Sequence, residues 1–173
     1  MADRETVQSI VIRAPIDAVW AEITRLRGKQ RFMLDAVLDT TLEPGAPLYY
    51  RSEDGKRIFV VGRVVDVEPP RRFVHTFLLT MRDDPLTVLA WELTEVDDGT
   101  RVTLRQSGWP ADAKGVEKVD STWAGILGQL KQVLETGDIP RAAKVRYALM
   151  RAFSWALPAK TKPGNVSVPD GRP

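Results

Sequence analysis

The chain has 173 residues, of which 43% are hydrophobic and 28% are charged, with no cysteine and a formal net charge of +2. This length can bury one sizeable core, and the composition is typical of a soluble globular protein. The lack of cysteine excludes disulfides and thiolate chemistry, while no apolar run is long enough for a membrane span and MADRETVQ does not resemble a signal peptide. We therefore expect a cytoplasmic protein.

The charge is distributed unevenly. Residues 138–173 contain seven Lys or Arg and two acidic residues, whereas residues 1–137 contain the remaining 18 basic and 21 acidic residues. The change in composition near Gly137 predicts two parts, a folded domain over 1–137 and a basic C-terminal segment over 138–173. Within that segment, residues 163–173 have the composition of a disordered tail.

The first elements along the chain are a strand and a helix. Residues 6–13 alternate as a strand does, and Pro15 then begins a helix in which apolar residues recur at helical spacing from Ile16 to Leu26. Gly28 ends this helix. Residues 30–34 are expected to form one further short turn.

Six strand-like runs follow, over 37–42, 48–52, 58–67, 72–80, 87–96 and 101–106. Short turns rich in Pro, Gly and Asp separate them, among them Asp97-Asp98-Gly99. Connections this short leave no room for crossover helices, so the sheet should be antiparallel.

A long amphipathic helix follows the last strand and ends at Gly137. Its apolar residues fall on one face of the helix: Trp123, Ile126, Leu127, Leu130, Val133 and Leu134. Such a face indicates packing against the sheet. The order of elements predicts an α+β protein with a curved antiparallel sheet wrapped around a long C-terminal helix.

Residues 141–157 predict an additional C-terminal helix with two interpretations. The favoured one is that Val145, Leu149 and Phe153 dock on the small residues Ala124, Gly125 and Gly128 at the back of the long helix. The alternative is a peripheral contact of 141–157 with an anionic membrane or an acidic protein, because the helix is both basic and amphipathic.

Four segments together resemble the START/SRPBCC helix-grip superfamily: IVIRAPIDAVWAEIT, GRVVDVEPPRRFVHTF, LTVLAWELTEVDDGTRVTLRQSGW and TWAGILGQLKQVLETG. Within it, the sequence is similar to the branch related to the heat-shock-protein-90 ATPase activator. The resemblance covers residues 5–137 and implies a helix-grip fold with a cavity between the sheet and the long helix. It does not specify a reaction, because this superfamily includes carriers, receptors and enzymes.

Alternation along the strands indicates which side chains would line that cavity. The candidate ligand-binding residues are Phe32, Phe73, His75, Phe77, Leu79, Leu89, Trp91, Leu104, Gln106, Trp123, Leu127 and Leu130. The competing interpretation is that these side chains simply fill a solid core. His75, the only histidine, could bond a ligand or serve as a base in the cavity, or could be a structural residue.

The sequence contains no evident nucleophile–base pair, no metal-ligand spacing and no phosphate-binding glycine loop. We therefore expect no catalytic residues, cofactor, metal or nucleic-acid partner. The leading hypothesis is non-enzymatic binding or sensing of a small hydrophobic or amphipathic molecule, such as a lipid, polyketide or aromatic compound. The alternatives are a protein-interaction or chaperone-associated module and, third, a cyclase- or hydrolase-like enzyme.

Overall fold

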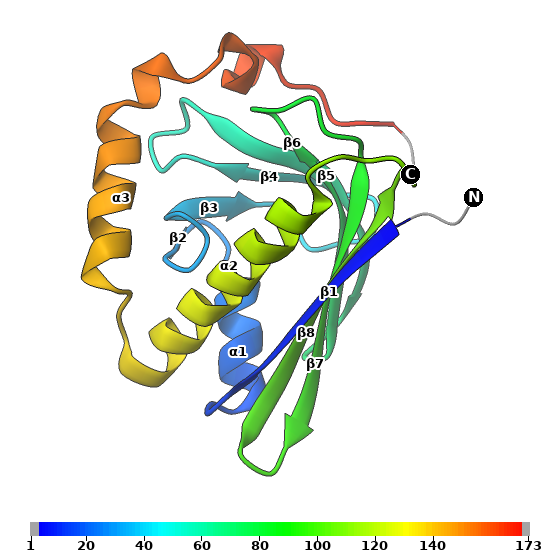
Figure 1. Ribbon diagram of the computed structural model, residues 1–173, viewed down its shortest axis with the longest axis vertical. Helices are drawn as coiled ribbons and strands as arrows, with labels where there is room; N and C mark the ends of the chain where they lie inside the picture. The colour runs from blue at the N-terminus through cyan, green and yellow to red at the C-terminus, as the bar shows by residue number, and fades with distance from the viewer. Residues whose placement is uncertain (1–3, 171–173) are drawn as a thin grey trace.

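The computed structural model describes residues 4–170 and shows one curved sheet that curls around a long helix (Figure 1). All of its strands pair antiparallel, in the order β1-β8-β7-β6-β5-β4-β3-β2. The strands are β1 Arg4–Ile12, β2 Lys29–Gln30, β3 Ala36–Asp39, β4 Pro47–Arg51, β5 Ile58–Glu68, β6 Arg72–Leu79, β7 Thr87–Val96 and β8 Gly99–Trp109. The predicted α+β helix-grip architecture is confirmed.

The first helix, α1 Ile16–Ile23, is shorter than the sequence pattern predicts. At its end, Gln30 Nε2 donates to Ile23 O at 2.9 Å and Thr24 Oγ1 donates to Trp20 O at 2.7 Å, so side chains bond the carbonyls of the last turn. Ile16, Val19 and Ile23 are buried in the main core.

The sheet bends strongly at β5. The register between β5 and β6 shifts between Val64 and Asp66, which indicates a bulge in the ladder. Gly62 lies close to the backbone of β6, since a Cβ at this position would lie 1.9 Å from Thr76 O. Only glycine allows this approach, and the resulting curvature gives the sheet a concave face for the helix.

The long helix α2, Val116–Thr136, crosses the concave face as predicted (Figure 1). Its residues Trp123, Ile126, Leu127 and Leu130 are buried in the main core. Lys131 Nζ donates to Val11 O at 2.7 Å and so attaches the helix to β1. Gly137 ends α2 in the left-handed conformation, with φ of 79°.

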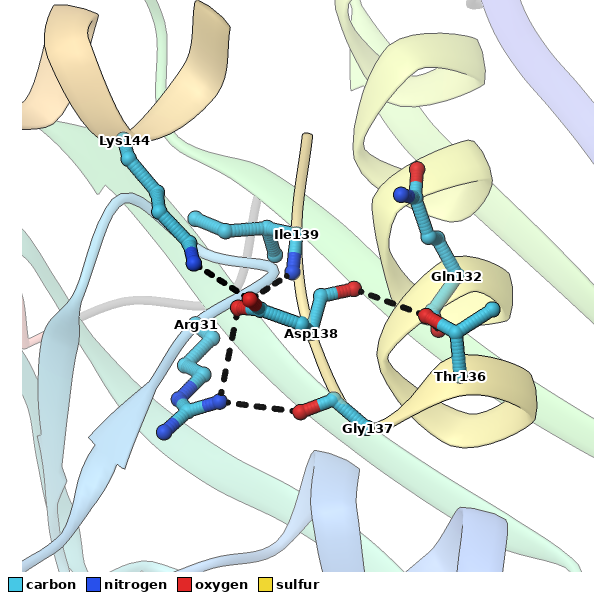
Figure 2. Close-up of polar contacts among 7 residues, drawn as sticks. All are labelled: Arg31, Gln132, Thr136, Gly137, Asp138, Ile139 and Lys144. Atoms are coloured by element: carbon cyan, nitrogen blue, oxygen red, sulfur yellow. Dashed lines mark hydrogen bonds and ion pairs between the residues drawn. The ribbon is translucent and has the colours of Figure 1, made fainter. Parts of the chain in front are cut away.

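A polar joint connects α2 to the next helix, α3 Arg141–Ala152 (Figure 2). The Asp138 carboxylate accepts a hydrogen bond from Ile139 N at 2.9 Å, binds Lys144 Nζ, and lies 3.7 Å from Arg31 Nη1. Arg31 Nη1 also donates to Gly137 O at 3.0 Å. After the joint, α3 packs between Leu34, which lies between β2 and β3, and Val133 of α2.

The predicted docking of the C-terminal helix on the back of α2 is wrong. Val145, Leu149 and Phe153 are more than half exposed, and a Cβ at Gly125 or Gly128 would have no atom of any other element among residues 4–170 within 4 Å. The buried face of α3 is instead formed by Ala143 and Tyr147, which cluster with Ile139, Leu34 and Val133.

The helix also ends at Ala152 rather than at residue 157. Pro158 favours an extended residue before it, and Leu157 indeed has φ of −65° and ψ of 147°. Short turns follow at Ser154–Ala156, Ala159–Thr161 and Pro163–Asn165.

The sequence predicts disorder from residue 163, whereas the structure places 163–170 beside the sheet (Figure 1). Arg63 of β5 donates from Nε to Pro169 O at 3.2 Å and from Nη2 to Asp170 Oδ1 at 3.2 Å. Upstream, Arg57 Nη1 donates to Thr161 Oγ1 at 3.0 Å. Residues 171–173 of that predicted tail lie outside the described residues.

Candidate functional site

An apolar cavity of about 170 Å³ lies between the first half of α2 and the sheet. Its walls come from α2, from β8, from the start of β5 with Tyr50 of β4, from the end of β6 and the β6–β7 loop, and from Met33, Leu34 and Ala36. The lining residues used below are Leu34, Tyr50, Phe59, Phe77, Arg82, Asp84, Thr87, Gln106, Val119 and Trp123.

Four of the predicted binding residues line this cavity, namely Phe77, Leu79, Gln106 and Trp123. The rings of Phe77 and Trp123 meet edge to face with centroids 5.6 Å apart. This arrangement brings β6, β8 and α2 together at one apolar wall, as strand alternation predicts.

The other eight are packed in the core or beneath the cavity and are not part of its lining: Phe32, Phe73, His75, Leu89, Trp91, Leu104, Leu127 and Leu130. The cavity is therefore confined to the first half of α2. Beneath its second half, Val19 and Ile23 of α1 join the same core cluster, so the concave face is filled there. The sequence pattern identifies which side chains face the concave side of the sheet. It does not identify the part of that side that α1 fills.

Three polar side chains form a continuous hydrogen-bonded chain in the cavity wall. Trp123 Nε1 donates to Gln106 Oε1 at 2.6 Å, and Gln106 Nε2 donates to Thr87 Oγ1 at 2.8 Å. Thr87 Oγ1 in turn donates to Phe77 O at 3.0 Å. The chain fixes the Trp123 ring and satisfies its indole N–H and the Gln106 amide, so this part of the wall is held rigidly.

The polar residues in the cavity lining include Arg82, Asp84, Tyr50 and Trp109, whose indole Nε1 has no partner among residues 4–170. Arg82 Nε pairs with Asp84 Oδ2 at 3.1 Å, and the Asp84 side chain is only 16% exposed. Burial raises the pKa of the Tyr50 phenol well above its ordinary value, so Tyr50 presents a neutral hydroxyl. These groups could orient the polar end of an otherwise apolar molecule.

The sequence interpretation did not assign Tyr50, Arg82 or Asp84 to the site. The alternation of Leu48 with Tyr50, both buried, is a signal that could have placed Tyr50 on the inner face. No comparable signal exists for Arg82 and Asp84, because they lie in the irregular β6–β7 loop, where sequence has no period.

His75 lies in the core and not in the cavity lining. It is fully buried, its ring centroid lies 5.0 Å from that of Phe73, and Nδ1 contacts Thr76 O at 2.8 Å. A carbonyl can only accept, so Nδ1 carries the proton of the neutral ring, and Nε2 has no partner among residues 4–170. Burial lowers the pKa of His75 to about 4, which keeps the ring neutral at physiological pH.

The described residues 4–170 contain no group of three or more His, Cys, Asp or Glu side chains placed to hold a metal ion. None of the helices formed by these residues has the length and apolar character that crossing a membrane requires.

A curved antiparallel sheet that grips one long helix around an apolar cavity defines a helix-grip protein of the SRPBCC superfamily. The family described as "Activator of Hsp90 ATPase homolog 1-like protein" matches residues 13–135, and the chain belongs to this family.

Solved structures with the same fold include protein MLL2253 from Mesorhizobium loti, which is 22% identical with a TM-score of 0.66 and matches 79% of this chain and 100% of its own. DynU16, described as "a putative protein in the dynemicin biosynthetic locus", is 25% identical with a TM-score of 0.67; the match covers 78% of this chain and 48% of that chain. The Aha1 dimer from Colwellia psychrerythraea is 19% identical with a TM-score of 0.61, over 78% and 98% of the two chains. None of the curated proteins matches the sequence.

Proposed function

We propose that the protein binds or senses a small apolar or amphipathic organic molecule in the cavity and does not transform it. The observation that carries this proposal is the apolar cavity beside the first half of α2, whose lining includes the Arg82–Asp84 ion pair. Such a combination of apolar walls with few polar groups is typical of small-molecule sites. The similarity to a protein of a biosynthetic locus supports a small molecule as the occupant.

The volume limits what fits inside. A cavity of about 170 Å³ is close to the roughly 150 Å³ of an engineered apolar cavity that accepts benzene. One aromatic ring or a short acyl segment therefore fills the enclosed space. A larger ligand would have its more polar part next to Arg82 and Asp84, the charged residues of the lining.

Titration with phenol and with 2-naphthol, followed by heteronuclear NMR, tests this proposal. We expect saturable shifts of the amide signals of the cavity-lining residues Ala36, Thr87 and Thr122. Native mass spectrometry of gently purified protein would show the mass of any molecule retained from the cell.

A cavity-filling variant makes the test specific. Val119→Trp places a large ring into the cavity from α2 and should abolish the shifts. The matched control Val145→Trp adds the same ring on α3, where the residue is 59% exposed, and should bind as the wild type does. Equal binding by both variants would exclude this cavity as the site.

A second candidate function, a chaperone-associated interaction, is favoured by the family match over residues 13–135. An Hsp90 ATPase assay with and without the protein distinguishes the two. Stimulation that is retained by Val119→Trp would favour this candidate, because the filled cavity would then be irrelevant to the activity.

A further inference from the structure

The C-terminal segment displays a row of large apolar side chains to solvent. Val145 and Leu149 on α3 and Phe153 directly after it, spaced four residues apart, are 59%, 54% and 59% exposed, and Trp155 in the next turn is 75% exposed. Contiguous exposed apolar groups on a monomeric protein are uncommon and indicate an interaction surface. We refer to these four residues as the apolar stripe.

The orientation of the stripe is held by contacts on the opposite side of α3. Tyr147 is buried against Leu34 and Val133, and its hydroxyl donates to Gln129 Oε1 on α2. Arg151 Nη1 pairs with Asp35 Oδ2 at 2.7 Å. Together with the joint at Asp138 (Figure 2), these contacts place the stripe outward as part of the folded structure.

The stripe lies between basic residues. At about 100° per residue, Arg141 lies about 40° from Val145 at one edge of the stripe and Arg146 about 20° from Phe153 at the other. Both arginines are exposed, and neither pairs with a carboxylate of residues 4–170, although Arg146 lies over the Tyr147 ring. Residues 139–169 as a whole contain six Lys or Arg and no Asp or Glu.

We propose that α3 and the turn after it bind the surface of an anionic lipid bilayer. The helix would lie in the plane of the interface, with the apolar stripe among the upper acyl chains and the two arginines on lipid phosphates. A Phe and a Trp beside cationic side chains fit this boundary, which is apolar on one side and anionic on the other.

The charge pattern favours a bilayer over a second copy of the chain. Pairing two such surfaces would bring two sets of cationic side chains together without acidic partners in 139–169 to compensate them. The proposal is independent of any cavity ligand. It nevertheless places the membrane close to the cavity, because Leu34 both packs against α3 and lines the cavity wall.

Vesicle flotation of the full chain tests the proposal, with phosphatidylcholine vesicles compared with vesicles containing roughly one third phosphatidylglycerol. We expect flotation only with the anionic vesicles. Leu149→Ser/Phe153→Ser should abolish it, whereas the matched control Val7→Ser, which removes a 44% exposed apolar side chain from β1, should not. Circular dichroism confirms that each variant folds.

The arginines are tested separately from the stripe. Arg141→Gln/Arg146→Gln should weaken binding to anionic vesicles by more than about tenfold, since each cation near the surface contributes roughly fivefold. Arg101→Gln/Lys114→Gln makes the same charge change at two exposed residues outside the segment and should have a small effect. Comparable weakening by both pairs would overturn the proposal, since it would indicate attraction by net charge alone.

Size-exclusion chromatography over a range of concentrations tests the competing occupant. We expect the wild type and Leu149→Ser/Phe153→Ser to elute at the same position. A dimer that the double substitution dissociates, without flotation of the wild type, would overturn the proposal and assign the stripe to contacts between copies.

Discussion

The two regions of this molecule use the same kinds of side chain in opposite ways. In the helix-grip body, residues 4–137, Trp91 and Trp123 are buried between the sheet and α2. In the C-terminal segment, residues 138–170, Phe153 and Trp155 are largely exposed. The hydrophobicity of a side chain alone therefore does not determine whether it is buried. It is buried where another element packs against it.

The physical difference lies in what faces each helix. The apolar face of α2 meets the concave side of the sheet, and burial of this face contributes most of its attachment. No sheet faces the apolar stripe of α3, which is held mainly through Tyr147 and polar contacts such as Arg151–Asp35. We expect the stability of the body to depend mainly on buried apolar volume. The attachment of the segment should depend mainly on its polar contacts.

Replacing one tryptophan in each region should give the largest difference in stability between the two regions. Trp123→Ala removes a ring that is 4% exposed and packs against Phe77 and Trp91, so we expect a loss of about 3–5 kcal/mol in the free energy of unfolding. Trp155→Ala should change it by less than about 0.5 kcal/mol. Urea denaturation measures both. Similar losses would mean that the stripe is buried in solution.

The body should also lose stability in mild acid because of His75. Its pKa is lowered to about 4 in the folded state, so between pH 6.5 and 4 the unfolded chain binds the proton and the folded chain does not. The contribution of neutral His75 to stability is therefore present above pH 6.5 and is lost as the pH falls from 6.5 toward 4. From pH 6.5 to 5 the free energy of unfolding should decrease by about 1.5 kcal/mol.

Urea denaturation of the wild type and His75→Phe at several pH values checks this prediction. The chain has no other histidine, so the stability of the variant should change very little with pH above pH 5. An unchanged profile in the variant would show that other groups cause it.

Much of the body could be predicted from the sequence because its signals are local and periodic. Strand β7, Thr87–Val96, has the predicted bounds, and α2 ends at the predicted Gly137. Period-two alternation also placed Phe77 and Gln106 on the inner face correctly. In each case, the residues along one strand or helix are sufficient to predict its bounds or its inward face.

The cavity and the path of the C-terminal segment depend on contacts distant in sequence. His75 shares its strand face with Phe77, yet only Phe77 reaches the cavity, because the sheet curves and the core fills the remaining space. Similarly, Arg31 and Asp138 meet at the joint between α2 and α3, although they are far apart in the sequence. Neither residue is unusual in its own part of the sequence, so no pattern predicts the contact.

The third prediction concerns the polar attachment of the segment. Arg57 is 8% exposed and donates to Thr161 Oγ1 at 3.0 Å and to Trp155 O at 3.3 Å. Arg57→Met should speed hydrogen exchange at the Thr161 and Lys162 amides, which corresponds to about 1–2 kcal/mol of lost local stability. Lys56→Met, at a neighbouring residue with an 80% exposed side chain, is the control. Unchanged exchange in Arg57→Met would show that these hydrogen bonds do not hold the segment.

The smallest expected effect comes from a substitution at Gly128, which tests whether the C-terminal segment leaves the back of α2 uncovered. A Cβ at Gly128 would meet no atom within 4 Å, and the residue is in the middle of a regular helix. Gly128→Ala should therefore raise the free energy of unfolding by roughly 0.5–1 kcal/mol, because alanine restricts the unfolded chain and is the better helix former.

Gly137→Ala on the same helix is the matched control. Gly137 has φ of 79°, a conformation that disfavours a Cβ by about 1 kcal/mol or more, so this variant should lose stability. Thermal and urea denaturation of both variants measure the opposite signs. Destabilisation by Gly128→Ala would mean that α3 packs closely on this surface in solution. The apolar stripe would then be covered by the chain itself, leaving nothing to bind a membrane.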